Sequence, residues 1–295
     1  MNFSSALGTA LVAAVIFFGV IQNSLNPSLF LDPKALILVL GGTVGLSLMA
    51  FPFSRLKEVF DFLVYGMFLK KRTDDIKNVV DIIRIAHFYQ VNPRMFLQHL
   101  QINYIFLKEA AVLLSQERLS VEEISLILQN RKTSFQKKYA EENKMLLAMA
   151  KFPPGLGILG TTSGLIEALY KLNVTGTSSG FSWSLIAGSL ISFFWGMALA
   201  NFVFLPLADY SDRISQEDLF SRELAIHGII MIKQGYPVAS VSEAMISELP
   251  ITDQMMLRSL IFKNQEAEEP DEEVSVAMVN LDFLDQTQND ITSQK

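Results

Sequence analysis

Few side chains in this sequence could perform acid–base, nucleophilic or metal chemistry. None of the 295 residues is Cys, which excludes disulfides, thiolate metal sites and cysteine nucleophiles. The three histidines, His87, His99 and His227, are too scattered for a metal-ligand set. We therefore interpret each His as a structural or surface residue, and we expect no enzyme, no metal and no organic cofactor.

One glycine-rich run matches a known chemical motif by its letters alone. Gly155-Leu-Gly157-Ile-Leu-Gly160 fits the dinucleotide-binding pattern, but it follows a diproline instead of a strand and lies in an apolar stretch. Gly160 and Gly164 are small residues four apart, as are Gly41 and Gly45, and such pairs let helices approach closely in lipid. The run therefore predicts helix packing and no nucleotide site.

Hydroxyl side chains lie within the same apolar stretches. In lipid a hydroxyl either bonds to its own helix or lines a polar path, and the sequence leaves both interpretations open. The residues are Thr161, Thr162, Ser163 and Ser192.

Carboxylates are nearly absent from these stretches. Glu167 lies near one end beside Lys171, where it is either an interfacial ion-pair partner or a functional group. Between Lys151 and Glu167, and throughout Trp183–Ala208, there is no Asp, Glu, His or Lys. If the protein conducts ions, the essential carboxylate must therefore come from another chain.

The elements that position these residues are predicted membrane spans. Half of the residues are apolar and 18% are charged, against about 25% charged in ordinary soluble domains. Four stretches approach the length of about 20 residues that a span needs. The first lacks a basic segment and an obvious cleavage site, so we interpret it as a span and not a signal peptide. The stretches are Ala6–Ile21, Ala35–Phe53, Leu146–Leu172 and Trp183–Ala208.

The distribution of charge predicts the orientation. Residues 54–151 carry 16 of the 24 Lys and Arg, residues 207–295 carry six, and the short connections 22–33 and 173–180 carry none. The positive-inside rule then places both termini and the long loop in the cytoplasm of a multi-pass inner-membrane protein. No basic run interleaved with aromatic residues indicates a nucleic-acid partner.

The long loop carries helical patterns. Val79, Ile82, Ile83 and Ala86 recur at helical spacing, and Ser120-Val-Glu-Glu123 is a capping box. Because no strong breaker occurs from Val121 to Phe152, this helix is expected to run unbroken into the third span. Ser215-Gln-Glu-Asp218 and Ser240-Val-Ser-Glu243 are expected to open two more helices, divided by Gly235-Tyr-Pro237.

These patterns predict an all-α membrane protein with four transmembrane helices and a cytoplasmic helical bundle. The last segment carries nine acidic residues and one Lys, so the rest of the chain is slightly positive although the whole carries −6. An acidic tail that is poor in aromatic residues is expected to be disordered. The predicted segments are spans 1 and 2 (1–53), a cytoplasmic helical domain (54–145), spans 3 and 4 (146–208), C-terminal cytoplasmic helices (209–263) and the tail (264–295).

Four runs together resemble the flagellar stator A subunits of the MotA/PomA family, within the wider group that includes TolQ and ExbB. The runs are FLDPKALILVLGGTVGLSLMAFPFSRL, KFPPGLGILGTTSGLIEAL, ALANFVFLPLA and SRELAIHGIIMIKQG, and the resemblance covers most of residues 5–250. It implies a homopentamer around the helices of a B subunit, a MotB/PomB-like chain with a single span and an essential Asp. It also implies that a flagellar rotor switch protein is the load.

The resemblance assigns roles to individual residues. Pro154 and Pro206 match the two family prolines tied to coupling ion flow with movement, and Thr161 matches the pore-facing Thr of span three. Asp32-Pro33, Gly41-Gly42-Thr43 and Pro52 match the framework of the second span.

The departures from the family pattern concern the ion and the load. The pore Thr of span four falls on Phe193, beside Ser192, and sodium-type relatives carry an Asp about where Lys151 stands, so both departures favour protons. The rotor-facing Arg and Glu of the family fall on His87 and Met95, with Arg94 adjacent. Lys108 and Glu109 are further candidates for the rotor contact.

The sequence therefore predicts a stator A subunit that couples ion flow, of protons by preference, to rotation of the flagellar rotor. Thr161, Thr162, Ser192 and Phe193 are the candidate ion pathway, and Pro154 and Pro206 are the candidate hinges. Two alternatives stay open. The same motor could drive gliding, TolQ/ExbB-like envelope transport or phage defence, or the chain could be a membrane scaffold that conducts nothing.

Overall fold

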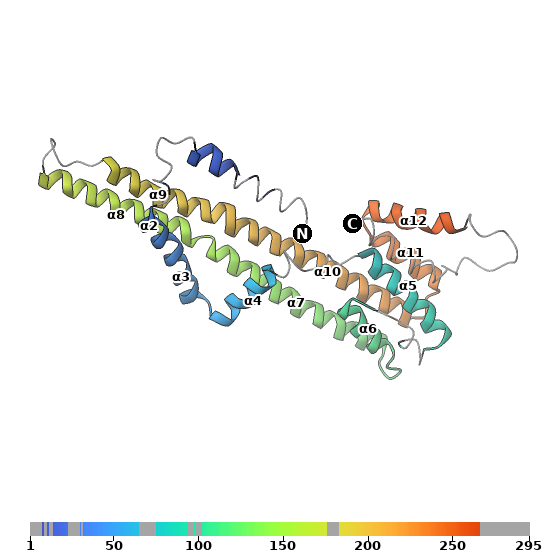
Figure 1. Ribbon diagram of the computed structural model, residues 1–295. Coiled ribbons are helices and arrows are strands. Elements are labelled where there is room, and N and C mark those ends of the chain that lie inside the picture. Colours follow the sequence, from blue (N-terminus) through green and yellow to red (C-terminus); the bar gives the residue numbers. More distant parts are fainter. Residues whose placement is uncertain are drawn as a thin grey trace. The chain divides into compact units, whose positions relative to one another are not determined.

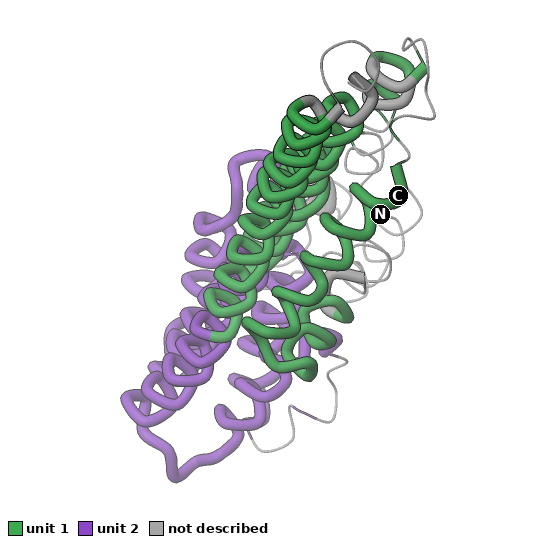
Figure 2. Tube along the Cα trace, turned by 90° about the vertical axis from the view of Figure 1, so that its left-hand side faces the viewer, with its two compact units in different colours: residues 1–71, 138–215 green, residues 72–137, 216–295 purple. Residues whose placement is uncertain are grey.

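The computed structural model describes residues 8, 11, 14–22, 30, 32–64, 75–93, 97, 102–175 and 183–265. Every element over these residues is a helix, which confirms the expected all-α class (Figure 1). Two compact units divide the chain (Figure 2): unit 1 is residues 1–71 with 138–215, and unit 2 is residues 72–137 with 216–295. Helices α7 (Val121–Met149) and α10 (Leu205–Lys233) contribute residues to both units.

The N-terminal part of unit 1 consists of short helices, of which α2, η3 and α3 join into one run. These are η1 (Val15–Gln22), α2 (Pro33–Leu36), η3 (Ile37–Gly41), α3 (Gly42–Ala50) and α4 (Phe53–Val64), where η marks π-helical turns. Asp32 caps the run from α2 to α3, because its Oδ1 accepts the Lys34 N–H at 3.0 Å and Pro33 occupies the first helical position.

The rest of unit 1 is built on α8 (Phe152–Thr175), α9 (Trp183–Leu199) and η6 (Ala200–Phe204). Among the described helices, α8 and α9 make the most extensive contact, and the run from α2 to α3 packs on both. The indole N–H of Trp195 on α9 donates to the Phe30 carbonyl at 2.6 Å. This bond ties the segment before α2 to the α8–α9 pair.

Two helical runs among the described residues are long and apolar enough to span a membrane. They are Pro33–Ala50 and the run that begins at Ile186 and continues through α10, and they match the second and fourth expected spans. The first expected span is described at residues 8, 11 and 14–21, and its second half lies in η1, which ends at Gln22. The third corresponds mainly to α8, whose glycines, hydroxyls and Glu167 make it too polar for the same criterion. The structure thus supports two of the four expected spans.

Large apolar side chains of unit 1 face outward. Ile37 is 73% exposed and Met49 87%, and Leu159, Ile166 and Leu169 on α8 are also exposed. A helix that is apolar on its outer face needs lipid or another protein surface around it.

Unit 2 is a bundle with a conventional hydrophobic core. Its helices are α5 (Asp75–Val91), α6 (Ile105–Leu114), α11 (Val238–Glu248), α12 (Ile251–Gln265) and the adjoining parts of α7 and α10. The predicted helical stripe on α5 is confirmed, since Val79, Ile82, Ile83 and Ala86 are all buried in this core. The predicted tail, 264–295, lies outside the described residues except for Asn264 and Gln265, which end α12.

Two of the expected helix boundaries are confirmed. The Ser120 N–H donates to Glu123 Oε2 at 2.9 Å, and the Glu123 N–H donates to Ser120 Oγ at 3.2 Å, which forms the capping box at the start of α7. Between α10 and α11, Gly235 has a φ of +82°, a left-handed conformation that favours Gly. Pro237 then precedes the first residue of α11.

The expectation of an unbroken helix into the third span is wrong. Helix α7 ends at Met149, Ala150 and Lys151 form a turn, and α8 begins at Phe152. The cause is the diproline that follows. Without N–H groups, Pro153 and Pro154 cannot donate to the carbonyls of Met149 and Ala150, so the helical ladder is interrupted upstream of the prolines.

The expected helix starts at Ser215 and Ser240 are also wrong. Ser215 lies inside α10, where its Oγ donates to the Ser211 carbonyl at 2.8 Å. Helix α11 begins two residues before Ser240, at Val238. A capping pattern does not start a new helix where the preceding residues are already helical. This is the case at Ser215, because α10 continues directly from η6.

A π-helical segment joins α9 to α10. The Leu205 N–H bonds to the Ala200 carbonyl five residues back, and Asn201 Nδ2 donates to the Met197 carbonyl at 2.8 Å. Pro206, the second residue of α10, has no N–H for the Phe202 carbonyl. Because of the wider π-helical turn, the helix continues past Pro206 without a break.

Candidate functional site

The α8–α9 interface holds most of the residues that the sequence singled out. Glycines let the two helices approach. A Cβ placed on Gly196 would lie 2.5 Å from the Pro153 carbonyl oxygen, and one on Gly157 would lie 2.8 Å from that of Ser192. Gly160 and Gly164 face Ser192 and Ser189 of α9 in the same way. The prediction that this glycine run packs helices is therefore confirmed, and no strand precedes it among the described residues.

The second glycine pair behaves differently. A Cβ on Gly41 or Gly45 would meet nothing within 4 Å, whereas one on Gly42 would lie 2.8 Å from Leu156 of α8. Within this chain the close approach of the second span is therefore made at Gly42, and the close approach at Gly41 and Gly45 stays a prediction for contacts with another chain.

Thr161 bridges the two helices. Its Oγ1 lies 2.9 Å from the Gly157 carbonyl of its own helix and 3.0 Å from the Ser189 carbonyl of α9. Since a hydroxyl has one proton, it shares that donor between the two carbonyls. Ser192 is buried in the same interface, with 5% of its surface exposed. Thr161 and Ser192 thus lie on one interface, and their part in an ion pathway stays a prediction.

The other two candidate pathway residues lie elsewhere. Thr162 is exposed, and its Oγ1 bonds back to the carbonyls of Ile158 and Leu159, both at 3.0 Å. Phe193 is 42% exposed. Within this chain, neither side chain is buried between α8 and α9 with Thr161 and Ser192.

Sequence reasoning missed the hydroxyls of Ser189 and Ser47, and it assigned Thr43 only to the framework of the second span. Ser189 is buried, and its Oγ donates to the Ile186 carbonyl at 2.7 Å. On α3, Thr43 and Ser47 are each 3% exposed and bond to the carbonyls four residues back. The spacing of these residues in the sequence could have indicated them, because Ser189 precedes Ser192 by three residues and Ser47 follows Thr43 by four. Each pair therefore shares a helix face.

The carboxylate nearest to these hydroxyls in the sequence is engaged. Glu167 Oε1 accepts from Lys171 Nζ at 2.8 Å, one helical turn away, and both side chains are about half exposed. The pairing matches the interpretation of Glu167 as an ion-pair partner. Among the described residues, no group of three or more His, Cys, Asp or Glu could hold a metal ion.

The hinge candidates occupy two kinds of helical position. Pro154 is half-buried in the first turn of α8, where its missing N–H contributes to the break after α7. Pro206 is exposed in the first turn of α10, directly after η6, inside a helical run that continues. The first therefore marks a helix boundary and the second marks a widened turn.

The candidates for the rotor contact lie in unit 2. Lys108 and Glu109 are exposed on α6, and Glu109 Oε2 accepts from Arg131 of α7 at 2.7 Å. His87 is half-buried on α5, with its ring edge against Phe88. Arg94 lies outside the described residues.

An exposed mixed face surrounds Lys108 and Glu109. Ile105 is 73% exposed and Val112 is 44% exposed. The four residues are spaced as i, i+3, i+4 and i+7, so they share one face of α6. This face, which we call the α6 face, combines two apolar and two charged side chains.

Comparison with known proteins gives consistent results. Residues 93–223 match the model of the MotA/TolQ/ExbB proton channel family. Motility protein A of Bacillus subtilis is 22% identical over 260 residues, which cover 86% of this chain and 93% of that protein. The structure of Campylobacter jejuni MotAB aligns with a TM-score of 0.76 at 18% identity, over 85% of this chain and 97% of that one. The flagellar MotAB stator complex of B. subtilis aligns with a TM-score of 0.74 at 20% identity, over 85% and 98%.

Proposed function

We propose that the chain is an ion-conducting stator A subunit and not an enzyme, because residues 93–223 match the MotA/TolQ/ExbB proton channel family and Motility protein A of Bacillus subtilis is similar over most of its length. One observation carries the proposal. The α8–α9 interface buries the hydroxyls of Thr161, Ser189 and Ser192, yet residues 152–166 and 183–208 contain no ionisable side chain. Such an interface lines a polar path but has no group of its own that takes up a proton.

The missing acid comes from a partner in this proposal. The two solved relatives are complexes of MotA with MotB, which supports a B subunit with one span and an essential Asp as the partner here. Protonation would remove the charge of that Asp and change its contact with a ring of five copies of this chain. The membrane potential supplies about 2.3 kcal/mol per charge per 100 mV for each step.

Two departures from the family pattern support protons as the ion. Phe193 offers no oxygen to a dehydrated cation, and Lys151, exposed in the turn before α8, would repel one. We place the chain in the bacterial inner membrane with four spans and with both termini in the cytoplasm, as the Lys and Arg distribution indicates.

The load is the flagellar rotor in this proposal, and the α6 face is its contact candidate. A surface with two exposed aliphatic residues beside Lys108 and Glu109 can bind a partner by both burial and charge. Because His87 and Met95 replace the charged pair of the family, a different load on the same motor is the alternative to be tested.

The prolines provide a test of coupling. Pro154→Ala restores a donor for the Ala150 carbonyl, and Pro206→Ala restores one for the Phe202 carbonyl, with no change in charge. We expect both variants to assemble with the B subunit and to lose most of the movement. Pro237→Ala, at the start of α11, is the matched control and should move normally. Normal movement in both variants would assign these prolines to helix geometry alone.

The ion and the activity are tested together by flux. The chain is expressed with its B subunit, and motor speed or ion influx is measured against external sodium at fixed pH and membrane potential. We expect the rate to follow pH and to ignore sodium. A rate that rises with sodium and saturates would exclude proton coupling. An absence of flux, when the B-subunit Asp is present, would favour the non-conducting scaffold.

A further inference from the structure

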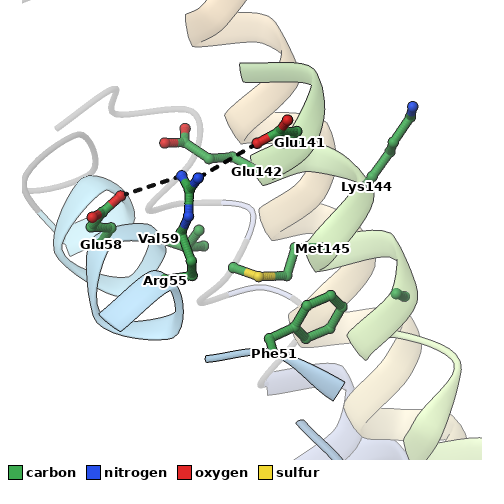
Figure 3. Close-up of a pocket in the computed structure, with 9 residues that line it drawn as sticks. Phe51, Arg55, Glu58, Val59, Glu141, Glu142, Lys144 and Met145 are labelled. Carbon is green, nitrogen blue, oxygen red and sulfur yellow. Dashed lines mark ion pairs between the residues drawn. The ribbon is translucent and has the colours of Figure 1, made fainter. Parts of the chain in front are cut away.

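Unit 1 contains a charged cavity outside the hydroxyl interface. It has a volume of about 340 Å³ and lies between α4 and α7 (Figure 3). Phe51, Val59 and Met145 give it apolar walls. Its charged side chains come from both helices: Arg55 and Glu58 from α4, and Glu141, Glu142 and Lys144 from α7.

Two neighbouring carboxylates of α7 differ in this cavity. The side chain of Glu141 is 68% exposed, and one of its oxygens lies 3.8 Å from an Arg55 nitrogen. The side chain of Glu142 is only 7% exposed and reaches toward α4 (Figure 3). Its Oε1 lies 3.8 Å from Lys138 Nζ, and its Oε2 is buried with no hydrogen-bond partner in the structure. A buried, ionised oxygen without a donor is costly, so the arrangement favours the protonated carboxyl.

The surrounding charges act in both directions on Glu142. Lys138 on the same helix and Arg55 on α4 favour the ionised form, whereas Glu58 on α4 opposes it. On α10, which also packs on this part of α7, Asp212 is turned to Asn143 and accepts its amide at 3.2 Å. Burial is the largest influence, and it raises the pKa of Glu142 above the ordinary value for Glu.

We infer that Glu142 is a proton-binding residue of the α4–α7 cavity. In the structure, where Oε2 is buried without a donor, the carboxyl holds its proton. On release the O–H bond breaks, the proton passes to water, and the carboxylate is left facing Lys138 and Arg55. The site lies outside the pathway proposed above, whose acid belongs to the partner, so it does not depend on ion conduction.

Infrared difference spectroscopy tests the inference directly, on the full chain assembled with a B subunit whose essential Asp is replaced by Asn, so that the partner contributes no protonated carboxyl from that position. The carbonyl stretch of a protonated carboxylic acid is followed as the pH rises. We expect a band that persists above about pH 4.3, where an ordinary Glu titrates. It should be missing in Glu142→Gln and present in Glu141→Gln, the matched control one residue away. A band that survives in Glu142→Gln, or that titrates at the ordinary pH, would overturn the assignment.

Stability against pH provides a second measurement that needs no flux. Because the pKa of Glu142 is raised in the folded state, the wild type loses stability as pH rises from the unfolded pKa through the folded one. The ratio of the folding constants of Glu142→Gln and wild type should therefore grow with pH over that window, tenfold for each unit by which the pKa is raised. A ratio that is independent of pH contradicts the inference.

Two further variants keep the test valid if Glu142→Gln fails to fold. Lys138→Gln removes a cation that favours the carboxylate, so the band should titrate at higher pH. Glu58→Gln removes an opposing anion, so the band should titrate at lower pH. Both side chains are about half exposed, and their replacement should be tolerated. An unchanged midpoint in both variants would overturn the proposal.

Discussion

The α8–α9 interface of unit 1 and the core of unit 2 are both made of packed helices, but the first buries small residues and the second buries large aliphatic side chains. Of the eleven largest fully buried side chains among the described residues, ten belong to unit 2, and only Val39 belongs to unit 1. The α8–α9 pair instead buries Gly157, Gly196, Ser189 and Ser192. In water, the hydrophobic effect favours burial of large aliphatic side chains. In lipid that effect is absent between helices, and they associate through small residues that let their backbones approach closely.

The two regions also differ in how they handle charge. In unit 2, Arg222 Nε donates to Asp218 Oδ2 at 2.7 Å, and both side chains are more than nine-tenths buried. The guanidinium carbon of Arg222 lies 3.6 Å from the centre of the Phe135 ring and 4.8 Å from that of Phe106. Between α8 and α9 the buried polar groups are neutral hydroxyls. This difference in buried charge is the one expected between a helical bundle in water and a helix pair in lipid.

The buried pair should give the largest effect. Arg222→Met keeps contact with the two rings but removes the cation that pairs with the buried carboxylate of Asp218, so we expect the free energy of unfolding to fall by about 3–5 kcal/mol. The matched control is Arg131→Met, which breaks the half-exposed pair with Glu109 and should cost less than about 1 kcal/mol. Denaturant unfolding of both variants makes the comparison. Equal losses would remove the distinction between the buried and the exposed pair.

The glycine contacts should give an intermediate effect. Gly196→Ala places a methyl group against the Pro153 carbonyl, and overpacking of this kind costs about 1–3 kcal/mol. Gly155→Ala on α8 is the control, since its Cβ would meet nothing within 4 Å, and added helix propensity should make it neutral or slightly stabilising. Thermal unfolding in one detergent measures both variants. If Gly196→Ala were as stable as the control, the close approach of α8 and α9 would not matter to unit 1.

The hydroxyl bridge should give the smallest effect. Thr161→Val removes the shared bond to the Gly157 and Ser189 carbonyls, and we expect a loss of about 1 kcal/mol. Thr162→Val, next in sequence but exposed, should be close to neutral. The difference in thermal stability between the two variants is the measurement, and a larger loss for Thr162→Val would contradict the placement of Thr161 between the helices.

Local signals predicted the fold well where they act within one turn. The capping box at Ser120 and the Gly235-Tyr-Pro237 break lie where the sequence indicated. The same reasoning failed at Ser215, because the helix that passes through it comes from η6 upstream. It also misplaced the end of α7, because Pro153 acts on a carbonyl four residues before it. Both failures arise from backbone partners several residues away.

The sequence predicted which residues of the candidate site carry hydroxyls, but not which way their side chains point. It indicated hydroxyl side chains at residues 161–163, yet Thr161 bridges to α9 while Thr162 is exposed. Successive helix positions point about 100° apart, and the face that meets α9 is fixed by Gly157, Gly160 and Gly164 packing on it. The sequence contained those glycines, and their spacing from Thr161 was the unused clue.

The π-helical turn at Ala200–Phe204 has a consequence for the whole helical run that contains it. In a π turn the backbone N–H bonds to the carbonyl five residues back instead of four, so the turn contains one residue more than a turn of a regular α-helix. The faces of α9 and α10 are therefore out of phase by about 100°, and one helical wheel cannot represent both. Removal of a single residue between 200 and 204 would return the run to one phase. Ser192 and its neighbours on α9 would then turn by about a quarter of a revolution relative to every residue of α10.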